Sequence, residues 1–167
     1  MSLQGSRVII VGGSSGLGLA TARVALTRGA QVAVTGRSPE RLHAVQAELG
    51  EGLETAAVDA LDEAAMQKFL QSRDGIDHLF VTIGSYVADC HLEPAMDLLR
   101  GPLDTRLVSA LHATKYALAK MSEKGSITLM SGTAVARPIP GTSMSSASCG
   151  AVEGLMRGLA VDLAPIW

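Results

Sequence analysis

The sequence predicts an α/β fold with three layers, in which a parallel β-sheet is covered by helices on both faces. Short apolar runs rich in β-branched residues alternate with stretches of helical composition along the whole chain. This alternation is typical of parallel sheets whose strands are joined by right-handed helical crossovers. Only 18% of the residues are charged and the mean hydropathy is +0.28, as expected for strands that are buried on both faces. The 167 residues have the usual size of one domain, so we expect a single domain over 1–167.

Helix start and stop signals divide the first half of the chain into three strand–helix pairs. Gly29 follows the first helical stretch and suits a left-handed C-terminal cap. Ser38 is a favourable N-cap, Pro39 suits the first helical position, and Glu40 lies near the positive end of the helix dipole. Gly50 ends this second helix. We therefore expect strands at 7–11, 31–35 and 53–58, and helices at 17–27, 38–50 and 62–72.

The second half of the chain continues the alternation but contains two longer loops. The stretch 84–102 holds Pro94, Gly101 and Pro102 and is expected to be irregular, and 131–142 contains two further prolines. Ligands of open α/β sheets bind beyond the carboxyl ends of the strands, so these loops should form the walls of a site. We expect strands at 78–83 and 126–130, and helices at 103–121 and 143–163.

The composition argues against several classes of function. The net charge is −2, the 14 lysines and arginines are scattered, and aromatic residues make up 3%, so nothing favours a nucleic-acid partner. No apolar run reaches the roughly 18 residues of a membrane span. The four histidines have no metal-ligand spacing, and we expect no metal. Cys90 and Cys149 stand alone, as free thiols do in cytosolic proteins, so we expect a cytoplasmic protein.

A glycine-rich turn between the first strand and the first helix is the strongest functional signal. Glycines let the backbone turn tightly and approach a pyrophosphate, while the helix N-terminus supplies free N–H groups and the positive end of its dipole. In this context the turn predicts a Rossmann-type dinucleotide-binding fold; the alternative is a tight turn without a ligand. We expect the dinucleotide to contact Gly12, Ser14, Ser15, Gly16, Leu17 and Gly18.

The end of the second strand indicates which dinucleotide is bound. A site for NAD has a carboxylate there for the ribose hydroxyls, whereas a site for NADP has a cation for the 2′-phosphate. The sequence continues with Gly36, Arg37 and Ser38, and Arg41 lies one turn further on. We therefore expect NADP(H) as the cofactor, contacted by Arg37 and Ser38. The alternative is that Arg37 is a solvated surface arginine.

With these features the chain resembles the short-chain dehydrogenase/reductase family over essentially its whole length. Residues 11–18 match the family's T-G-x-x-x-G-[I/L]-G, except that Val11 replaces the threonine. Residues 147–155 are similar to the family's A-S-K-A-A-V-x-G-L, and 125–132 look like its fifth strand and active-site serine region. The resemblance implies two further cofactor contacts, Asp59 beside the adenine and Gly84 after the fourth strand.

The same resemblance shows that the family's catalytic positions have changed. The family transfers hydride between nicotinamide and an alcohol or carbonyl group, using a serine, a tyrosine and a lysine. Here the tyrosine position is Ser145 and the lysine position is Cys149. The serine position is Gly132, with Ser131 adjacent, and the family's relay asparagine falls near Arg106. A serine hydroxyl without a neighbouring base cannot replace a phenol made acidic by an ammonium group.

Three interpretations of the function remain open. In the first, the chain is an NADP(H)-dependent oxidoreductase acting on an unknown small molecule, with Ser131 polarising the substrate and Tyr86 as a substitute acid. In the second, it is a non-catalytic NADP(H)-binding protein or a structural subunit. In the third, it is a fragment without a function of its own.

The resemblance also implies an incomplete sheet and an oligomer. Family members continue beyond the last helix into further strands, so we expect the sheet to lack the family's last strands, with the fifth strand at an exposed edge. Helices 103–121 and 143–163 occupy the positions of the family's dimer interface, and their apolar faces fit helix-on-helix packing. We expect a homodimer or tetramer.

Overall fold

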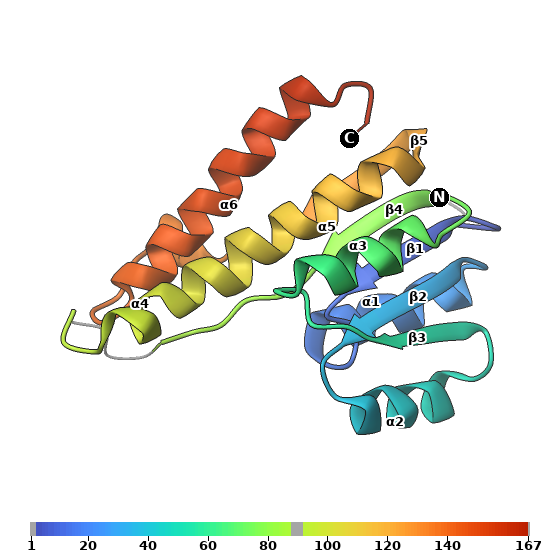
Figure 1. Cartoon of the computed structure of the whole chain (residues 1–167), viewed down its shortest axis with the longest axis horizontal. Coiled ribbons are helices and arrows are strands. Elements are labelled where there is room, and N and C mark those ends of the chain that lie inside the picture. Colours follow the sequence, from blue (N-terminus) through green and yellow to red (C-terminus); the bar gives the residue numbers. More distant parts are fainter. Residues whose placement is uncertain (1–2, 88–91, 167) are drawn as a thin grey trace.

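A five-stranded sheet forms the centre of the molecule (Figure 1). The computed structural model describes residues 3–87 and 92–166. The strand order is β3-β2-β1-β4-β5, and every pairing of neighbours is parallel. This confirms the expected Rossmann-type, doubly wound α/β fold, whose order reverses between β1 and β4. The strands are β1 (Arg7–Val11), β2 (Gln31–Gly36), β3 (Leu53–Ala57), β4 (Ile76–Val81) and β5 (Met121–Leu129).

Helices cover both faces of the sheet because successive strand residues point to opposite sides. In β1, Val8 and Ile10 belong to one apolar cluster and Ile9 and Val11 to the other, and none of the four is more than 5% exposed. The first cluster includes α1 (Gly16–Thr27) and α2 (Pro39–Leu49), and the second includes α3 (Glu63–Gln71) and α5 (Ser109–Ala117).

Two helices begin at polar caps, of which the sequence predicted the one at Ser38. Ser38 Oγ accepts a hydrogen bond from the Arg41 backbone N–H at 3.2 Å, which starts α2. Asp62 Oδ1 accepts one from the Ala65 N–H at 3.0 Å, which starts α3. Each cap satisfies an N–H group that would otherwise have no partner within its helix.

The long helix expected from residue 103 begins earlier, so the expected irregularity of 84–102 is wrong for its last part. Pro102 lacks an N–H and would ordinarily break a helix. However, Leu99 and Pro102 are both buried, and this segment packs against α6 (Ser143–Asp162). Tertiary burial therefore outweighs the local signal. In chain order the helical segments are α4 (Met96–Leu103), the π-helical turn η1 (Asp104–Val108), α5 and the 3₁₀ turn η2 (Leu118–Lys120).

The fourth and fifth strands also differ from expectation. β4 ends at Val81 rather than at 83, and directly beyond it the Thr82 hydroxyl donates to the carbonyl oxygens of Val11 and Gly12. β5 begins at Met121 rather than at 126, with a register shift opposite the start of β4. The loop 131–142 contains one 3₁₀ turn, η3 (Thr133–Val135).

An ion pair joins β1 to β4 at the amino-terminal end of the sheet. Arg7 donates from Nε to Asp77 Oδ2 at 3.0 Å and from Nη2 to Oδ1 at 3.1 Å. The Arg7 backbone N–H also donates to Oδ2 at 2.9 Å. These hydrogen bonds to the charged form lower the pKa of the Asp77 carboxyl to about 2, against an opposing effect of partial burial.

We predict that Asp77→Asn destabilises the protein in a pH-dependent way. The folded-state pKa is depressed, so the stabilisation is complete above the ordinary value near 4 and is lost as the pH falls toward about 2. Arg7 is 38% exposed, and after allowing for solvent we expect a loss of about 1 kcal/mol at pH 7. Urea unfolding at pH 7 and at about pH 2.5 measures this difference, which should shrink at the lower pH. Asp74→Asn, the matched exposed control, should change stability less at pH 7. Equal losses for both variants would contradict the assignment.

Candidate functional site

Two hollows lie at opposite ends of the sheet. One has a volume of about 660 Å³ and is formed by the residues that follow β1, β2, β3 and β4; we call it the carboxyl-end cleft. This is where open α/β sheets bind ligands. It brings together most of the expected cofactor contacts, namely Gly12, Ser14, Ser15, Arg37, Ser38, Asp59 and Gly84.

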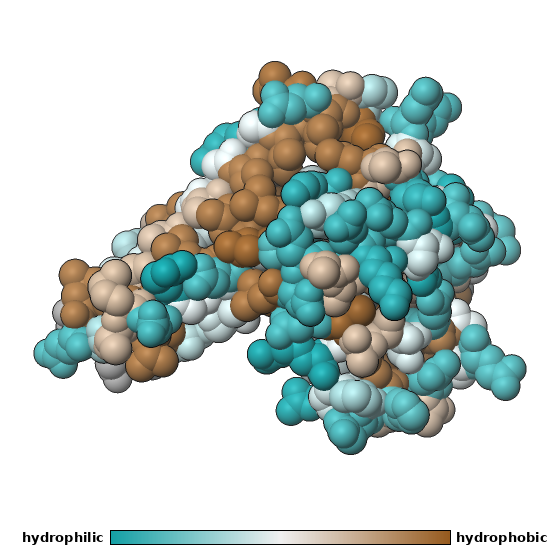
Figure 2. Space-filling view, viewed as in Figure 1, coloured by the Kyte–Doolittle hydropathy of each residue, from teal (hydrophilic) through white to brown (hydrophobic). Residues whose placement is uncertain are grey.

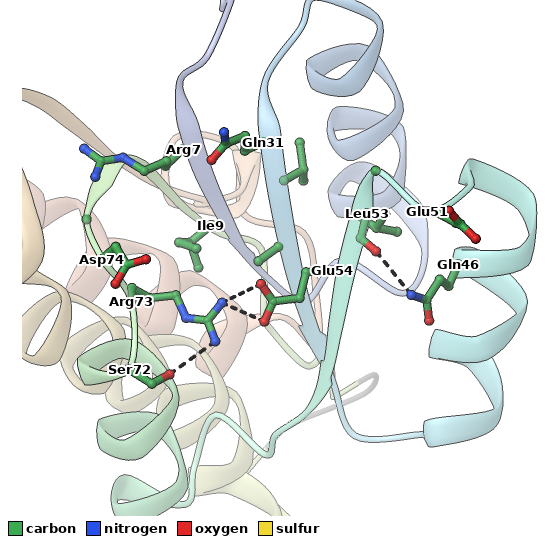
Figure 3. Close-up of a pocket in the computed structure, with 14 residues that line it drawn as sticks. Arg7, Ile9, Gln31, Gln46, Glu51, Leu53, Glu54, Ser72, Arg73 and Asp74 are labelled. Carbon is green, nitrogen blue, oxygen red and sulfur yellow. Dashed lines mark hydrogen bonds and ion pairs between the residues drawn. The ribbon is translucent and has the colours of Figure 1, made fainter.

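The other hollow, of about 540 Å³, lies at the amino ends of the strands (Figure 3). Its charged groups are largely paired within the chain. Arg73 donates from Nη1 to both carboxylate oxygens of Glu54, at 2.7 and 2.6 Å, and lies 4.6 Å from the ring centre of Phe69. Arg7 is held by Asp77. These pairs have structural roles, so we assign the candidate site to the carboxyl-end cleft.

The backbone of the glycine turn has dihedral angles and close contacts that exclude a side chain at several of its positions. Gly12 and Gly16 have φ of +95° and +53°, in the left-handed region that favours glycine. A Cβ on Gly13 would lie 2.5 Å from the Cβ of Val34, and a Cβ on Gly18 would strike the carbonyl oxygen of Gly12. The turn therefore lets α1 start very close to β1, with backbone atoms lining the cleft.

The N-terminus of α1 is available to a ligand. Ser15 is the N-cap residue, yet its side chain makes no capping hydrogen bond among the described residues. Leu17, in the first turn, is 63% exposed. The first N–H groups of a helix have no partner within it and carry the positive end of the dipole, so an anion at this position would be stabilised.

The end of β2 offers cations and no carboxylate. Gly36 is buried, and Arg37 and Arg41 are exposed and line the cleft. The Ser38 hydroxyl is already used, because it donates to Glu40 Oε2 at 2.7 Å and accepts from the Arg41 N–H. The Ser38 hydroxyl, which we expected to contact the cofactor, thus caps α2 instead. The Arg37 guanidinium lines the cleft and can contact a ligand.

The cleft continues across the ends of β3 and β4. Asp59 accepts a hydrogen bond from the Leu61 N–H at 3.0 Å, which shapes the turn before α3. Thr82 holds the glycine turn through its hydroxyl, a role that sequence reasoning missed because Thr82 was expected to lie inside the fourth strand. Gly84 follows two residues later and also lines the cleft.

Ser131 does not belong to the described lining of this cleft. Its Oγ donates to Glu153 Oε1 at 2.9 Å and lies 3.5 Å from the carbonyl oxygen of Cys149. The sequence analysis missed Glu153, which lies one helical turn beyond Cys149 and could have been found from the spacing of four. Ser131 thus has a carboxylate as its partner, whereas the family's pattern predicts a phenol and an ammonium group in this region.

The two positions that the resemblance aligns with the family's tyrosine and lysine, Ser145 and Cys149, are buried. Ser145 is 5% exposed, and its Oγ has no hydrogen-bond partner among the described residues. Cys149 is a free thiol, 2% exposed, and its Sγ would lie 3.0 Å from a Cβ on Gly132. Neither side chain supplies an acid or a cation to the cleft.

The two tyrosines of the chain, Tyr86 and Tyr116, lie outside the described lining of this cleft. Tyr86 is 62% exposed, on the loop after Gly84, and is not a packing residue. Tyr116 Oη and Lys115 Nζ both donate to Glu63 Oε1 in α3. These two hydrogen bonds lower the pKa of the Glu63 carboxyl. Tyr116 and Lys115 therefore join α5 to α3.

Cys90 and His91 lie outside the described residues. Within 3–87 and 92–166, no group of three or more His, Cys, Asp or Glu side chains could hold a metal ion. None of the helices in that part of the chain combines the length and the apolar character needed to cross a membrane.

Comparison with known proteins identifies the family. Residues 6–166 match the family model of the short chain dehydrogenases. The chain is 30% identical over 184 residues to the short-chain dehydrogenase/reductase malC of Malbranchea aurantiaca, covering 98% of this chain and 69% of that protein. It is 31% identical over 161 residues to the 3-dehydrosphinganine reductase TSC10B of Arabidopsis thaliana, covering 91% of this chain but only 49% of that protein.

A solved structure agrees with the sequence relatives. The complex of BdcA with NADPH superimposes with a TM-score of 0.91 at 30% identity, over 98% of this chain and 68% of that one. The chain thus spans between about half and two thirds of the length of these relatives. The extent of the match shows that the chain belongs to the short-chain dehydrogenase/reductase family of oxidoreductases, which bind nicotinamide dinucleotides.

Proposed function

We propose that the chain binds NADP(H) in the carboxyl-end cleft. The observation that carries this proposal is the end of β2, where Arg37 lines the cleft and no carboxylate follows the strand. A guanidinium recognises a phosphate through charge-assisted hydrogen bonds, whereas ribose hydroxyls need an acceptor. Arg41, one turn along α2, adds a second cation. The complex of BdcA with NADPH supports this choice of nucleotide.

The glycine turn fits the pyrophosphate of the same molecule. Its glycines leave a backbone cradle that a Cβ at Gly13 or Gly18 would fill, and the first turn of α1 presents free N–H groups. Asp59 and Gly84 complete the expected set, at the ends of β3 and β4. When bound, the dinucleotide would supply hydride chemistry; the residues of this chain bind and orient it.

The proposed activity is hydride transfer between this cofactor and an alcohol or carbonyl compound. In that case Ser131, with Glu153 as its hydrogen-bond partner, is the nearest remaining group of the family's catalytic set. Tyr86 on the exposed loop is the second candidate for handling a proton. NADPH oxidation with a panel of aldehydes and ketones, lost on Ser131→Ala or Tyr86→Phe, would support an enzyme.

One observation favours a second candidate function, a non-catalytic NADP(H)-binding protein. The positions of the family's tyrosine and lysine hold Ser145 and Cys149, both at least 95% buried and neither a cation or a phenol. Proton transfer by a positioned acid is worth roughly 10²- to 10⁴-fold, so its loss reduces turnover without affecting binding. Saturable binding with no turnover across the panel would support this function.

We also propose that the chain forms a homodimer or a tetramer. Figure 2 shows apolar side chains gathered along α6. Leu111, Met156 and Val161 are 42%, 43% and 79% exposed, and a hollow of about 110 Å³ lined by apolar residues lies between β5 and α6. Light scattering on the purified chain should give a multiple of the 17.3 kDa mass; a monomer at micromolar concentration would contradict the proposal.

We predict that Arg37→Ser lowers the affinity for NADPH and leaves that for NADH unchanged. The variant removes charge-assisted hydrogen bonds to the 2′-phosphate, so we expect a loss of about 10- to 100-fold for NADPH. Calorimetric titration with both nucleotides measures the effect. Arg28→Ser, an exposed arginine after α1, is the matched control and should bind as the natural chain does. An equal effect on NADPH and NADH, or no effect, would show that Arg37 does not recognise the phosphate.

We predict that Gly18→Ala weakens nucleotide binding by at least about tenfold and lowers stability by roughly 1–3 kcal/mol, because the added methyl group strikes the Gly12 carbonyl oxygen. The control is Gly154→Ala in α6, where a Cβ meets nothing within 4 Å, and which should stabilise the helix by roughly 0.5–1 kcal/mol. Melting curves and NADPH titrations check both effects. Unchanged NADPH binding in a folded Gly18→Ala protein would argue against the cradle.

A further inference from the structure

Arg106 places a cation between the carboxyl ends of β4 and β5. It lies on the π-helical turn η1, and such turns are rare and often occur at functional sites. Its Nη1 donates to the Met130 carbonyl oxygen, just beyond β5, at 3.3 Å. The guanidinium also covers Gly84, beyond β4, because a Cβ on Gly84 would lie 2.7 Å from its Cζ. A side chain at position 84 would occupy the space that the guanidinium fills.

The charge of Arg106 is not neutralised by the described part of the chain. Its Nε is buried without a hydrogen-bond partner, and no carboxylate among the described residues forms an ion pair with it. Arg7 and Arg73, at the opposite end of the sheet, each pair with a carboxylate. A cation that is partly removed from water costs free energy unless it is paired. Arg106 therefore favours an anion from outside the described chain.

A second buried polar group, on a helix that packs against η1, also lacks a partner. Helix α6 packs against η1, and Ser145, in the first turn of α6, is buried with no hydrogen-bond partner for its Oγ among the described residues. A buried hydroxyl without a partner is costly, as is an unpaired cation. These two groups come from different elements, η1 and α6.

The anion in question is not the dinucleotide pyrophosphate. The glycine turn, which fits that group, follows β1, and α1 begins there. Adjacent strands lie about 4.8 Å apart, so the gap between β4 and β5 is roughly 7 Å further across the sheet. An anion at Arg106 would therefore belong to the molecule on which the cofactor acts.

We propose that Arg106 is a specificity residue that binds a carboxylate of the substrate. This rests on the proposed function and narrows it: the substrate class is a carbonyl or hydroxy compound that carries a carboxylic acid. A guanidinium suits this role because its planar set of N–H groups matches the geometry of a carboxylate. Because Gly84 has no side chain, the Arg106 guanidinium has space beside it. The hydrogen bond to the Met130 carbonyl oxygen orients the guanidinium.

Oxamate, an unreactive analogue of a 2-oxo acid, is the probe, and neutral oxamide is its matched control. Calorimetry follows their binding to the full chain, alone and saturated with NADPH. We expect oxamate to bind at least tenfold more tightly than oxamide. We further expect Arg106→Gln to weaken oxamate binding by about 10- to 100-fold, Arg106→Lys to retain part of it, and Arg28→Gln to have no effect. NADPH affinity should change less than oxamate affinity in the two Arg106 variants and should be unchanged in Arg28→Gln.

Equal binding of oxamate and oxamide by the natural chain would overturn the proposal, and so would unchanged oxamate binding in a folded Arg106→Gln protein. The comparison of oxamate with oxamide uses only the natural chain, so it can overturn the proposal even if Arg106→Gln fails to fold. A loss of NADPH affinity in Arg106→Gln with no change in oxamate binding would assign the residue to the cofactor and contradict the inference. Absence of NADPH binding by the natural chain would refute the proposed function instead, while oxamate binding to the nucleotide-free protein still tests Arg106.

Discussion

The architecture of the site depends on one set of hydrogen bonds that fixes the glycine turn to three strands. The N–H groups of Gly12 and Gly13 both donate to the Thr35 carbonyl oxygen of β2, at 3.1 and 2.9 Å. From the other side, the Thr82 hydroxyl donates to the carbonyl oxygens of Gly12 and Val11 of β1, at 3.0 and 3.2 Å. The turn is therefore held at the point where the sheet order reverses, and α1 can start only because Gly18 has no side chain there.

The two halves of the site differ in how closely they follow the family pattern. The half near β1 and β2 has what a phosphorylated dinucleotide requires: a glycine cradle, a helix N-terminus and the guanidinium of Arg37. In the half near β4 and β5, the resemblance places Ser145 and Cys149 where the family pattern has a phenol and an ammonium group, and Arg106 lies on another element there. Binding and chemistry use different residues in this fold, so one can persist while the other changes.

The sequence was most informative where local chemistry decides the structure. The glycines of the turn, the cap at Ser38 and the apolar run of β1 act over a few residues, and the structure agrees with them. It was least informative where distant segments meet. Helix α4 forms through Pro102 because α6 covers it, and the partner of Ser131 is Glu153, 22 residues away. The placement of the Arg106 guanidinium over Gly84 likewise depends on the packing of η1 against the ends of two strands.

Amide hydrogen exchange of the intact chain, with and without saturating NADPH, tests the central claim most directly, because it reports where the nucleotide lies. The account predicts slower exchange in three segments at the carboxyl ends of the strands, 12–18, 36–41 and 82–85, with little change elsewhere in the sheet. Protection at the amino-end hollow, around 51–54 and 72–75, would place the nucleotide at the wrong end of the molecule. No protection anywhere would mean that the glycine turn of this chain does not hold a dinucleotide.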